Sequence, residues 1–165
     1  MVLFGTDYMD NNIFPKKSSK NTEHNLVVTT NEITNDILQM INTDTTKSIV
    51  FDVPIKYGPK RDITFDFKVD LWEWNSFVRK IEYLEFRGQI VNNQLTAKHF
   101  EEMKYIRGLY IGSTNYALFD NEDISNLPMI PHFSFNGYGL VIRSENMNKW
   151  MEKLKLNGCG YVAYI

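Results

Sequence analysis

The chain has 165 residues, a formal net charge of −2 and a single cysteine. This length fits one domain with a hydrophobic core of its own, and the near-neutral charge lacks the basic footprint that argues for nucleic acid as a partner. One cysteine excludes an internal disulfide and fits a reducing compartment. No stretch approaches the roughly 18 apolar residues of a membrane span, and the first residues lack a signal-peptide pattern, so we expect a cytoplasmic protein without a membrane partner.

The N-terminal quarter predicts an arm followed by a strand and a helix. Residues 1–24 are polar and rich in turn-forming residues, which indicates an irregular arm, and we expect residues 25–165 to form a single α/β domain. A short strand is predicted at residues 26–28. Thr29 and Glu32 then have capping-box spacing at the start of an apolar stripe, which predicts a helix ending near residue 42.

Two strictly alternating runs follow the helix. Residues 49–55 and 63–71 each alternate apolar and polar side chains, which is typical of half-buried strands. Residues 57–60, Tyr-Gly-Pro-Lys, supply turn chemistry between them, so the pattern predicts a β-hairpin. The helix and this hairpin, over residues 25–69, are expected to cover one end of the residues that follow.

Residues 70–165 contain one pattern four times. An apolar residue is followed by two more at +3 and +5, and by glycine or serine at +7. The copies are Ile81-Leu84-Phe86-Gly88, Ile106-Leu109-Ile111-Ser113, Ile130-Phe133-Phe135-Gly137 and Met151-Leu154-Leu156-Gly158. Their starts are 25, 24 and 21 residues apart, a period typical of solenoid units built from one short strand and one helical segment. An ordinary α/β domain with evenly spaced strands is the alternative.

The four copies resemble leucine-rich repeats. The best match is Met151-x-x-Leu154-x-Leu156-x-x-Cys159, with cysteine at the Asn/Cys position of the family, whereas the other copies depart there with Gln89, Thr114 and Tyr138. The resemblance implies a small stack of short parallel strands and helices, with residues 25–69 as an N-terminal cap. It also implies that alternate strand residues point outward on one face. These residues are Tyr83, Glu85, Arg87, Tyr110, His132, Ser134, Asn136, Lys155 and Asn157.

A second topology fits the first half of the chain. Residues 25–91 also read as strand-helix-strand-strand-helix-strand, which is the order of a ferredoxin-like α+β fold. Under this interpretation the later units are a C-terminal extension of a small sheet.

Residues that could carry chemistry are scattered. Four aspartates, Asp52, Asp62, Asp66 and Asp70, would share the polar face of the hairpin, but Asp62 and Asp66 would lie about 13 Å apart along a strand and could not hold one ion. The three histidines, His24, His99 and His132, lack metal-ligand spacing. Cys159 lies in a Gly-Cys-Gly turn, where a buried filler is the more common role. We therefore expect no cofactor and no metal.

Two neighbouring tryptophans add one further expectation. Trp72 and Trp74 lie about 200° apart around a helix, so they cannot both face the core. One of them should be exposed, either as an interface anchor or as a partly buried cap residue.

The sequence thus favours a non-enzymatic protein that binds one protein partner, as an inhibitor. Tyr, Arg and His on the outward strand face are residue types that favour interfaces. Two settings fit: toxin immunity, or a phage or mobile-element protein acting against host defence. The rival hypotheses are a nuclease or nucleotide-processing enzyme using Asp66, His99 or His132, and a virion structural or assembly protein. The sequence leaves the oligomeric state open.

Overall fold

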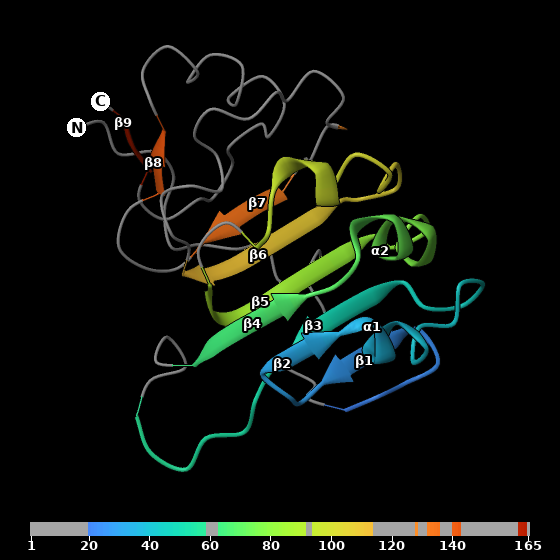
Figure 1. Ribbon diagram of the computed structural model, residues 1–165, viewed down its shortest axis with the longest axis horizontal. Coiled ribbons are helices and arrows are strands. Elements are labelled where there is room, and N and C mark those ends of the chain that lie inside the picture. Colours follow the sequence, from blue (N-terminus) through green and yellow to red (C-terminus); the bar gives the residue numbers. More distant parts are fainter. Residues whose placement is uncertain are drawn as a thin grey trace.

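The computed structural model shows a mixed α/β protein with a curled parallel sheet and few helices (Figure 1). It describes residues 20–58, 63–91, 94–113 and 128, together with the backbone of strands at residues 132–135, 140–142 and 162–164.

The longest feature is a row of five parallel strands, the main ladder. Its strands are β1 (Asn25–Val28), β3 (Ser48–Phe51), β5 (Tyr83–Ile90), β6 (Gly108–Ser113) and β7 (His132–Phe135). They lie side by side in chain order, and every pairing between them is parallel. Each time the chain returns to the main ladder, it therefore adds one strand beside the previous one.

A second row of parallel strands packs over the main ladder. It contains β2 (Glu32–Thr34), β4 (Thr64–Lys68) and the end of β5. The register between β5 and β6 shifts between Phe86 and Gln89. The first part of β5 pairs with β3 and β6, and its last part pairs with β4 and, at Gln89, with Ser113 of β6. This irregularity bends β5, because an interrupted ladder increases the local twist. A single strand thus belongs to both rows.

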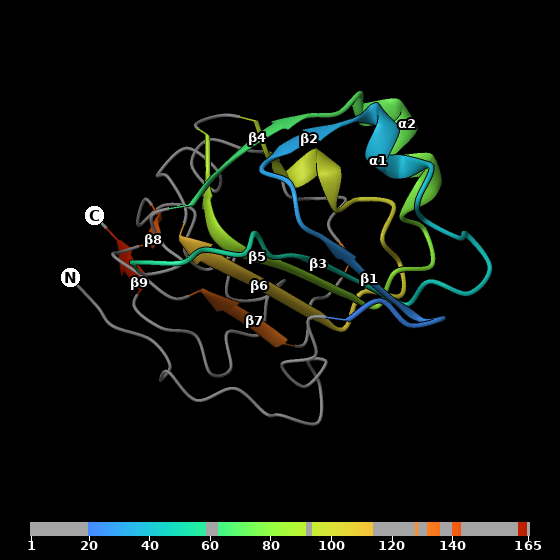
Figure 2. The same cartoon turned by 90° about the horizontal axis from the view of Figure 1, so that it is seen from below.

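Short helices lie beside the two rows. They are α1 (Asn35–Leu38), α2 (Leu71–Phe77) and the 3₁₀ helix η2 (Ala97–His99). Figure 2 shows α1 and α2 next to each other at one end of the sheet. The α2 helix begins at Asp70, whose carboxylate accepts the backbone N–H of Trp72 and so satisfies one of the free donors of the first turn.

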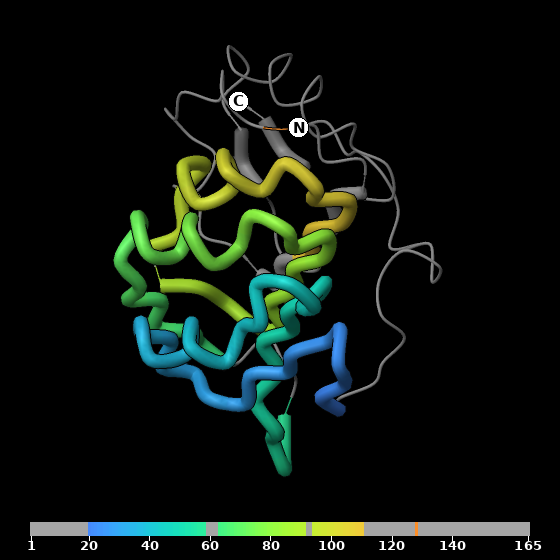
Figure 3. The backbone as a smooth tube through the Cα atoms, turned by 90° about the vertical axis from the view of Figure 1, so that its right-hand side faces the viewer, coloured from blue at the N-terminus to red at the C-terminus, as the bar shows by residue number. Residues whose placement is uncertain are grey.

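Three similar turns lead the chain back to the main ladder. In each of these return turns (residues 38–41, 78–81 and 103–106) the N–H of a buried isoleucine donates to the carbonyl three residues earlier. The three N···O distances are 3.0, 3.1 and 3.1 Å. Figure 3 shows the successive passages of the chain stacked from blue to yellow.

One main-chain connection also recurs where the strands begin. The carbonyl of His24 accepts the N–H groups of Lys47 and Ser48, at 2.7 and 3.0 Å. In the same way, the carbonyl of Lys47 accepts the N–H groups of Glu82 and Tyr83, and the carbonyl of Glu82 accepts those of Arg107 and Gly108, at 2.7 to 3.1 Å. The same structural unit therefore recurs from residue 24 to residue 108, which includes the region expected to be a cap.

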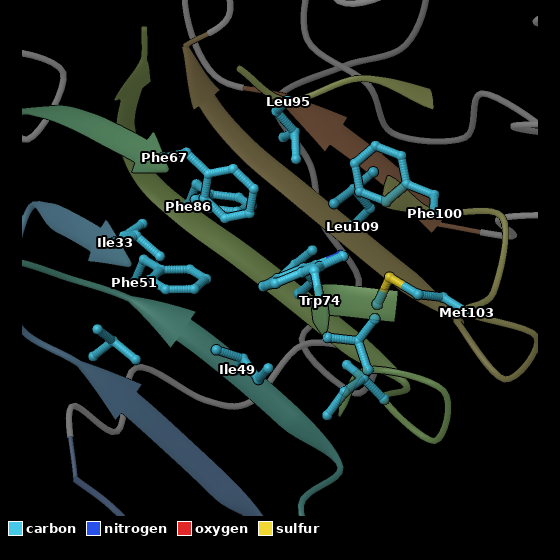
Figure 4. Packing of buried hydrophobic residues seen from close by; sticks show 14 of the residues in the cluster. Ile33, Ile49, Phe51, Phe67, Trp74, Phe86, Leu95, Phe100, Met103 and Leu109 are labelled. Atoms are coloured by element: carbon cyan, nitrogen blue, oxygen red, sulfur yellow. The ribbon is translucent and has the colours of Figure 1, made fainter. Parts of the chain in front are cut away.

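The core lies between the two rows and the helices (Figure 4). Phe51 of β3 stacks on Phe86 of β5, with ring centroids 4.6 Å apart and nearly parallel planes. Phe67 of β4 meets both Phe86 and the buried indole of Trp74 edge-on. Edge-to-face and offset stacked contacts of this kind are the favoured aromatic geometries, so the two rows are joined by an aromatic cluster.

A separate pair of strands is formed by later residues. β8 (Leu140–Ile142) and β9 (Val162–Tyr164) pair in parallel in a sheet of their own. The strand predicted near the end of the sequence corresponds to β9, while β8 was not predicted. The fourth copy of the sequence pattern, residues 151–158, falls outside the described residues.

The predicted hairpin is wrong. β3 pairs with β1 and β5, whereas β4 pairs with β2 and β5, and all of these pairings are parallel. The alternation predicted strands correctly but could not choose their neighbours. All four residues of β3 are buried, so both of its faces are covered, whereas an alternating pattern predicts one solvated face.

The ferredoxin-like alternative and the long first helix are also wrong. Every strand pairing in the described part of the chain is parallel, whereas that fold requires antiparallel neighbours. Residues 32–34 form β2, and the helix is limited to Asn35–Leu38. The isoleucine spacing fits a helix, but Ile33 is fully buried in a strand that pairs with β4, so tertiary pairing overrides the local periodicity.

Candidate binding surface

The outward side of the main ladder collects several of the residues singled out from the sequence. In β5, Leu84 and Phe86 point into the core and are fully buried, so Tyr83, Glu85 and Arg87 lie on the opposite side. Tyr110 of β6 is paired in register with Glu85 and shares that side. We call this side of the ladder the outer strand face; most of its side chains are buried, including Val27 at 3% and Val50 at 1% exposure. In the described residues it comprises Asn25, Val27, Ser48, Val50, Asp52, Tyr83, Glu85, Arg87 and Tyr110.

A triad of charged side chains lies at the centre of this face. Arg87 Nε donates to Glu85 Oε1 at 3.0 Å, and its Nη2 reaches Glu85 Oε2 at 3.4 Å. Arg87 Nη1 donates to Asp52 Oδ2 of the neighbouring strand at 2.9 Å. One guanidinium thus uses its planar fork on two carboxylates, a geometry that a lysine could not reproduce.

The triad is largely withdrawn from water. The side chains of Glu85, Asp52 and Arg87 retain only 7, 9 and 19% of their exposure. Burial raises the pKa of Glu85 above its ordinary value, because the lost hydration outweighs the attraction of Arg87. Burial alone would lower the pKa of Arg87, but its hydrogen bonds and attraction to Glu85 and Asp52 raise it. The three groups therefore depend on one another for their charges.

Glu85 and Arg87 are less exposed than their predicted role in partner contact implies. Glu85 is buried and Arg87 is mostly buried, because both lie between other strands of the ladder and bond to each other and to Asp52. Tyr83 and Tyr110 are partly buried; Tyr83 lies two residues before Glu85 on β5, and Tyr110 lies beside Glu85 on β6. Of the predicted contact residues with described side chains, Tyr83, Arg87 and Tyr110 are thus partly exposed, whereas Glu85 is buried.

A polar pair continues the outer strand face toward β1. The hydroxyl of Ser48 donates to Asn25 Oδ1 at 2.6 Å, and Asn25 Nδ2 donates to the carbonyl of Lys20 at 3.2 Å. Asn25, Ser48 and Asp52 were not predicted as part of this face, because their strands were assigned to a cap. The signal was present in the sequence: residues 48, 50 and 52 share one side of the strand, in phase with residues 83, 85 and 87.

The other predicted contact residues are less completely described. In β7, His132 and Ser134 are aligned with Gly108 and Tyr110, which are the register positions that the repeat predicts. Asn136, Lys155 and Asn157 lie outside the described residues, as does Cys159.

The aspartates do not share one face. Asp52 belongs to the outer strand face, whereas Asp66 lies in β4, where it accepts Gln94 Nε2 and pairs with Lys68 at 2.9 Å. The Gln94 hydrogen bond, aided by Lys68, lowers the pKa of Asp66. Asp70 caps α2, and Asp62 lies outside the described residues. Within the described ranges, no group of three or more histidine, cysteine, aspartate or glutamate residues is arranged to hold a metal ion.

His99 is a buried structural residue in the described core. Its Nδ1 accepts the N–H of Thr96 at 3.0 Å, and its ring lies edge-on to Phe67, 5.4 Å between centroids. Its backbone carbonyl accepts the indole N–H of Trp74 at 2.9 Å. Burial lowers the pKa of His99 to about 4, so the ring is neutral near pH 7. His24, by contrast, is exposed and bonds to the Thr45 carbonyl.

The two tryptophans of α2 have opposite environments, as their spacing requires. Trp74 is 1% exposed at the centre of the core, and Trp72 is 79% exposed. The expectation that one of them is exposed is confirmed.

Among the described residues, no helix is both long and apolar enough to cross a membrane. No family model, no curated protein and no solved structure matches this chain.

Proposed function

We propose that this chain is a non-enzymatic protein-binding module, a leucine-rich-repeat-like stack that inhibits a partner protein by covering it. The observation that carries the proposal is the pair of partly exposed tyrosines, Tyr83 and Tyr110, held next to Glu85 of the Asp52–Arg87–Glu85 triad. The setting would be toxin immunity, or a phage or mobile-element protein acting against a host defence enzyme.

The parallel ladder supports a role in binding because it fixes the surface in advance. Tyr83 and Glu85 lie on β5, and Tyr110 lies on β6 opposite Glu85, in a register set by main-chain hydrogen bonds. A preformed surface loses little conformational entropy when a partner docks. Tyrosine supplies a large apolar ring and a hydroxyl while losing few rotamers, which is why it is common in protein interfaces.

The triad supports the same role by holding the end of β3 against β5. Arg87 bonds to both Glu85 and Asp52, so each carboxylate has a hydrogen-bonded partner. A partner that docks on the tyrosines would therefore meet side chains with fixed hydrogen-bonding geometry. Such a surface favours specificity, because a poorly matched partner would leave buried polar groups unpaired.

The enzymatic alternative draws less support from the same residues. Asp66 is engaged by Gln94 and Lys68, and His99 is buried against aromatic rings, so each has a structural role in the fold. His132 is described only by the backbone position of its strand.

The proposal is tested by affinity capture followed by reconstitution with the purified partner. Tagged protein would be used to capture partners, and the affinity of any stoichiometric one would then be measured by calorimetry. The Tyr83→Ala/Tyr110→Ala variant should bind at least about ten-fold more weakly, which is the loss expected when interface tyrosines are truncated.

Tyr57 provides the matched control for this experiment. Its side chain is 86% exposed in the loop after β3, and it is not a member of the outer strand face. Tyr57→Ala should bind the partner as the unmodified protein does. Equal affinity of the double variant and the unmodified protein, with both folded by circular dichroism, would overturn the assignment of the outer strand face.

A further inference from the structure

The return turns form a second surface, with a different distribution of charge. We call a strand of the main ladder together with the turn before it a rung. The adjacent strands β5 and β6 begin at Tyr83 and Gly108, so positions 25 residues apart in their two rungs are equivalent. Arg79 is thereby matched with Lys104, Lys80 with Tyr105, and Glu82 with Arg107. Equivalent positions on neighbouring rungs are about 4.8 Å apart. We call the surface made by these six residues, with Asp44 and Lys47 of the preceding rung, the return-turn edge.

The carboxylates of the return-turn edge already have partners. Asp44 pairs with Lys80 and Glu82 pairs with Lys47, each at 3.6 Å. Arg79, Lys104 and Arg107 are exposed, and none of them forms an ion pair with another described residue. With five basic and two acidic side chains, the edge has a surplus of three positive charges on a chain whose net charge is −2. Counting Glu102, which precedes the last turn, still leaves a surplus.

An exposed aromatic residue lies within this basic surface. Tyr105 is 64% exposed and lies between Lys104 and Arg107 in sequence, while its neighbours Met103 and Ile106 are buried and anchor the turn. An exposed aromatic ring beside fixed cations can contact apolar side chains of a partner whose carboxylates meet the cations. The turn itself is held by the Ile106-to-Met103 hydrogen bond, so the surface is preformed.

We propose that the return-turn edge docks an acidic segment of a partner protein. Complementary charge is the argument for this occupant: Arg79, Lys104 and Arg107, from two adjacent rungs, have no counter-ion among the described residues. A nucleic acid fits less well, because a continuous phosphate backbone would also meet Asp44 and Glu82. This surface is separate from the outer strand face, so the inference stands or falls independently of the function proposed above.

The experiment titrates the full chain into two fluorescein-labelled probes, a poly-glutamate peptide and an oligothymidylate of equal length, followed by fluorescence anisotropy. The peptide should bind, more weakly as salt rises, and more tightly than the oligonucleotide. Arg79→Glu/Lys104→Glu should weaken peptide binding at least about ten-fold, because two attractive contacts become repulsive.

The control variant Lys56→Glu/Lys98→Glu makes the same change of net charge at two exposed lysines outside the return-turn edge. It should retain most of the affinity for the peptide. Equal losses in both variants would show that only overall charge matters and would overturn the docking site. Tighter binding of the oligonucleotide, or no peptide binding at low salt, would overturn it as well.

Discussion

The outer strand face and the return-turn edge use charge in opposite ways. On the outer strand face, Arg87 is bonded to Glu85 and Asp52, and all three side chains are mostly removed from water. On the return-turn edge, Arg79 and Lys104 are exposed and have no ion pair with other described residues. The difference shows that position within a strand decides the role of an arginine here: an inter-strand arginine stabilises the fold, whereas a turn arginine is available to a partner.

The largest effect on stability should come from breaking the Asp52–Arg87–Glu85 triad. Arg87→Met would leave Glu85 buried without its bonded cation and remove a partner of Asp52, which should reduce the free energy of unfolding by about 3–5 kcal/mol. Arg79→Met, on the exposed return-turn edge, should change the free energy of unfolding by less than about 0.5 kcal/mol. Urea denaturation followed by circular dichroism measures both. Equal stabilities of the two variants would refute the comparison.

The next effect concerns acid and the buried His99. Its pKa in the folded protein is about 4, below the ordinary value of 6.5, so the unfolded chain takes up the proton first. Its stabilising contribution is therefore complete above pH 6.5 and is lost as the pH falls toward 4, by roughly 3 kcal/mol in all.

A His99→Asn variant isolates that contribution from other titrating groups. The raised pKa of Glu85 acts in the opposite direction, lowering stability as the pH rises above the ordinary carboxyl value, and it is present in both proteins. The difference between the two unfolding curves should thus shrink as the pH falls from 7 to 4. A constant difference would show that His99 does not titrate in this range.

A smaller loss is expected at Gly88, where the two rows meet. A Cβ atom there would lie 2.6 Å from the carbonyl oxygen of Ile63 and 2.9 Å from the ring of Phe65. Gly88→Ala should cost about 1–3 kcal/mol, because backbone must shift to admit the methyl group. Thermal unfolding measures the loss, and an unchanged melting temperature would contradict the close approach of β5 to the residues before β4.

The smallest effect should be that of Trp72, which is 79% exposed. Trp72→Ala should change the free energy of unfolding by less than about 0.5 kcal/mol, whereas Trp74→Ala should cost about 3–5 kcal/mol by emptying the core. Urea denaturation of the two variants side by side gives both values. A large loss for Trp72→Ala would mean that its ring is covered.

The sequence predicted the strands near residues 83, 108 and 132 because each follows the same apolar spacing. Ile81 and Ile106 are both buried, at the ends of matching turns. The same spacing fails before β3: Ile41 ends the matching turn but lies seven residues before Ser48, and the position two residues before the strand is Thr46. The repeat therefore could not be traced into the N-terminal half, although Thr46 is itself buried.

The sequence shows that each copy of the repeated pattern ends in glycine or serine, but it does not show why a small residue is needed there. Gly88 lies inside β5 against the carbonyl of Ile63, where no side chain fits without a shift of the backbone. A single sequence identifies a position that requires a small residue but not the distant segment that approaches it. For the same reason Arg87 was predicted as a surface contact: its partner Asp52 is 35 residues away and was assigned to a hairpin.

The most direct test of the proposed function is hydroxyl-radical footprinting of the tyrosines, with and without the reconstituted partner. The account predicts that Tyr83 and Tyr110 lose reactivity in the complex, while Tyr57, which is 86% exposed, keeps its reactivity and serves as the internal reference. Protection of Tyr105 in the same complex would add the return-turn edge to the footprint. Unchanged labelling of Tyr83 and Tyr110 in a fully formed complex would contradict binding through the outer strand face.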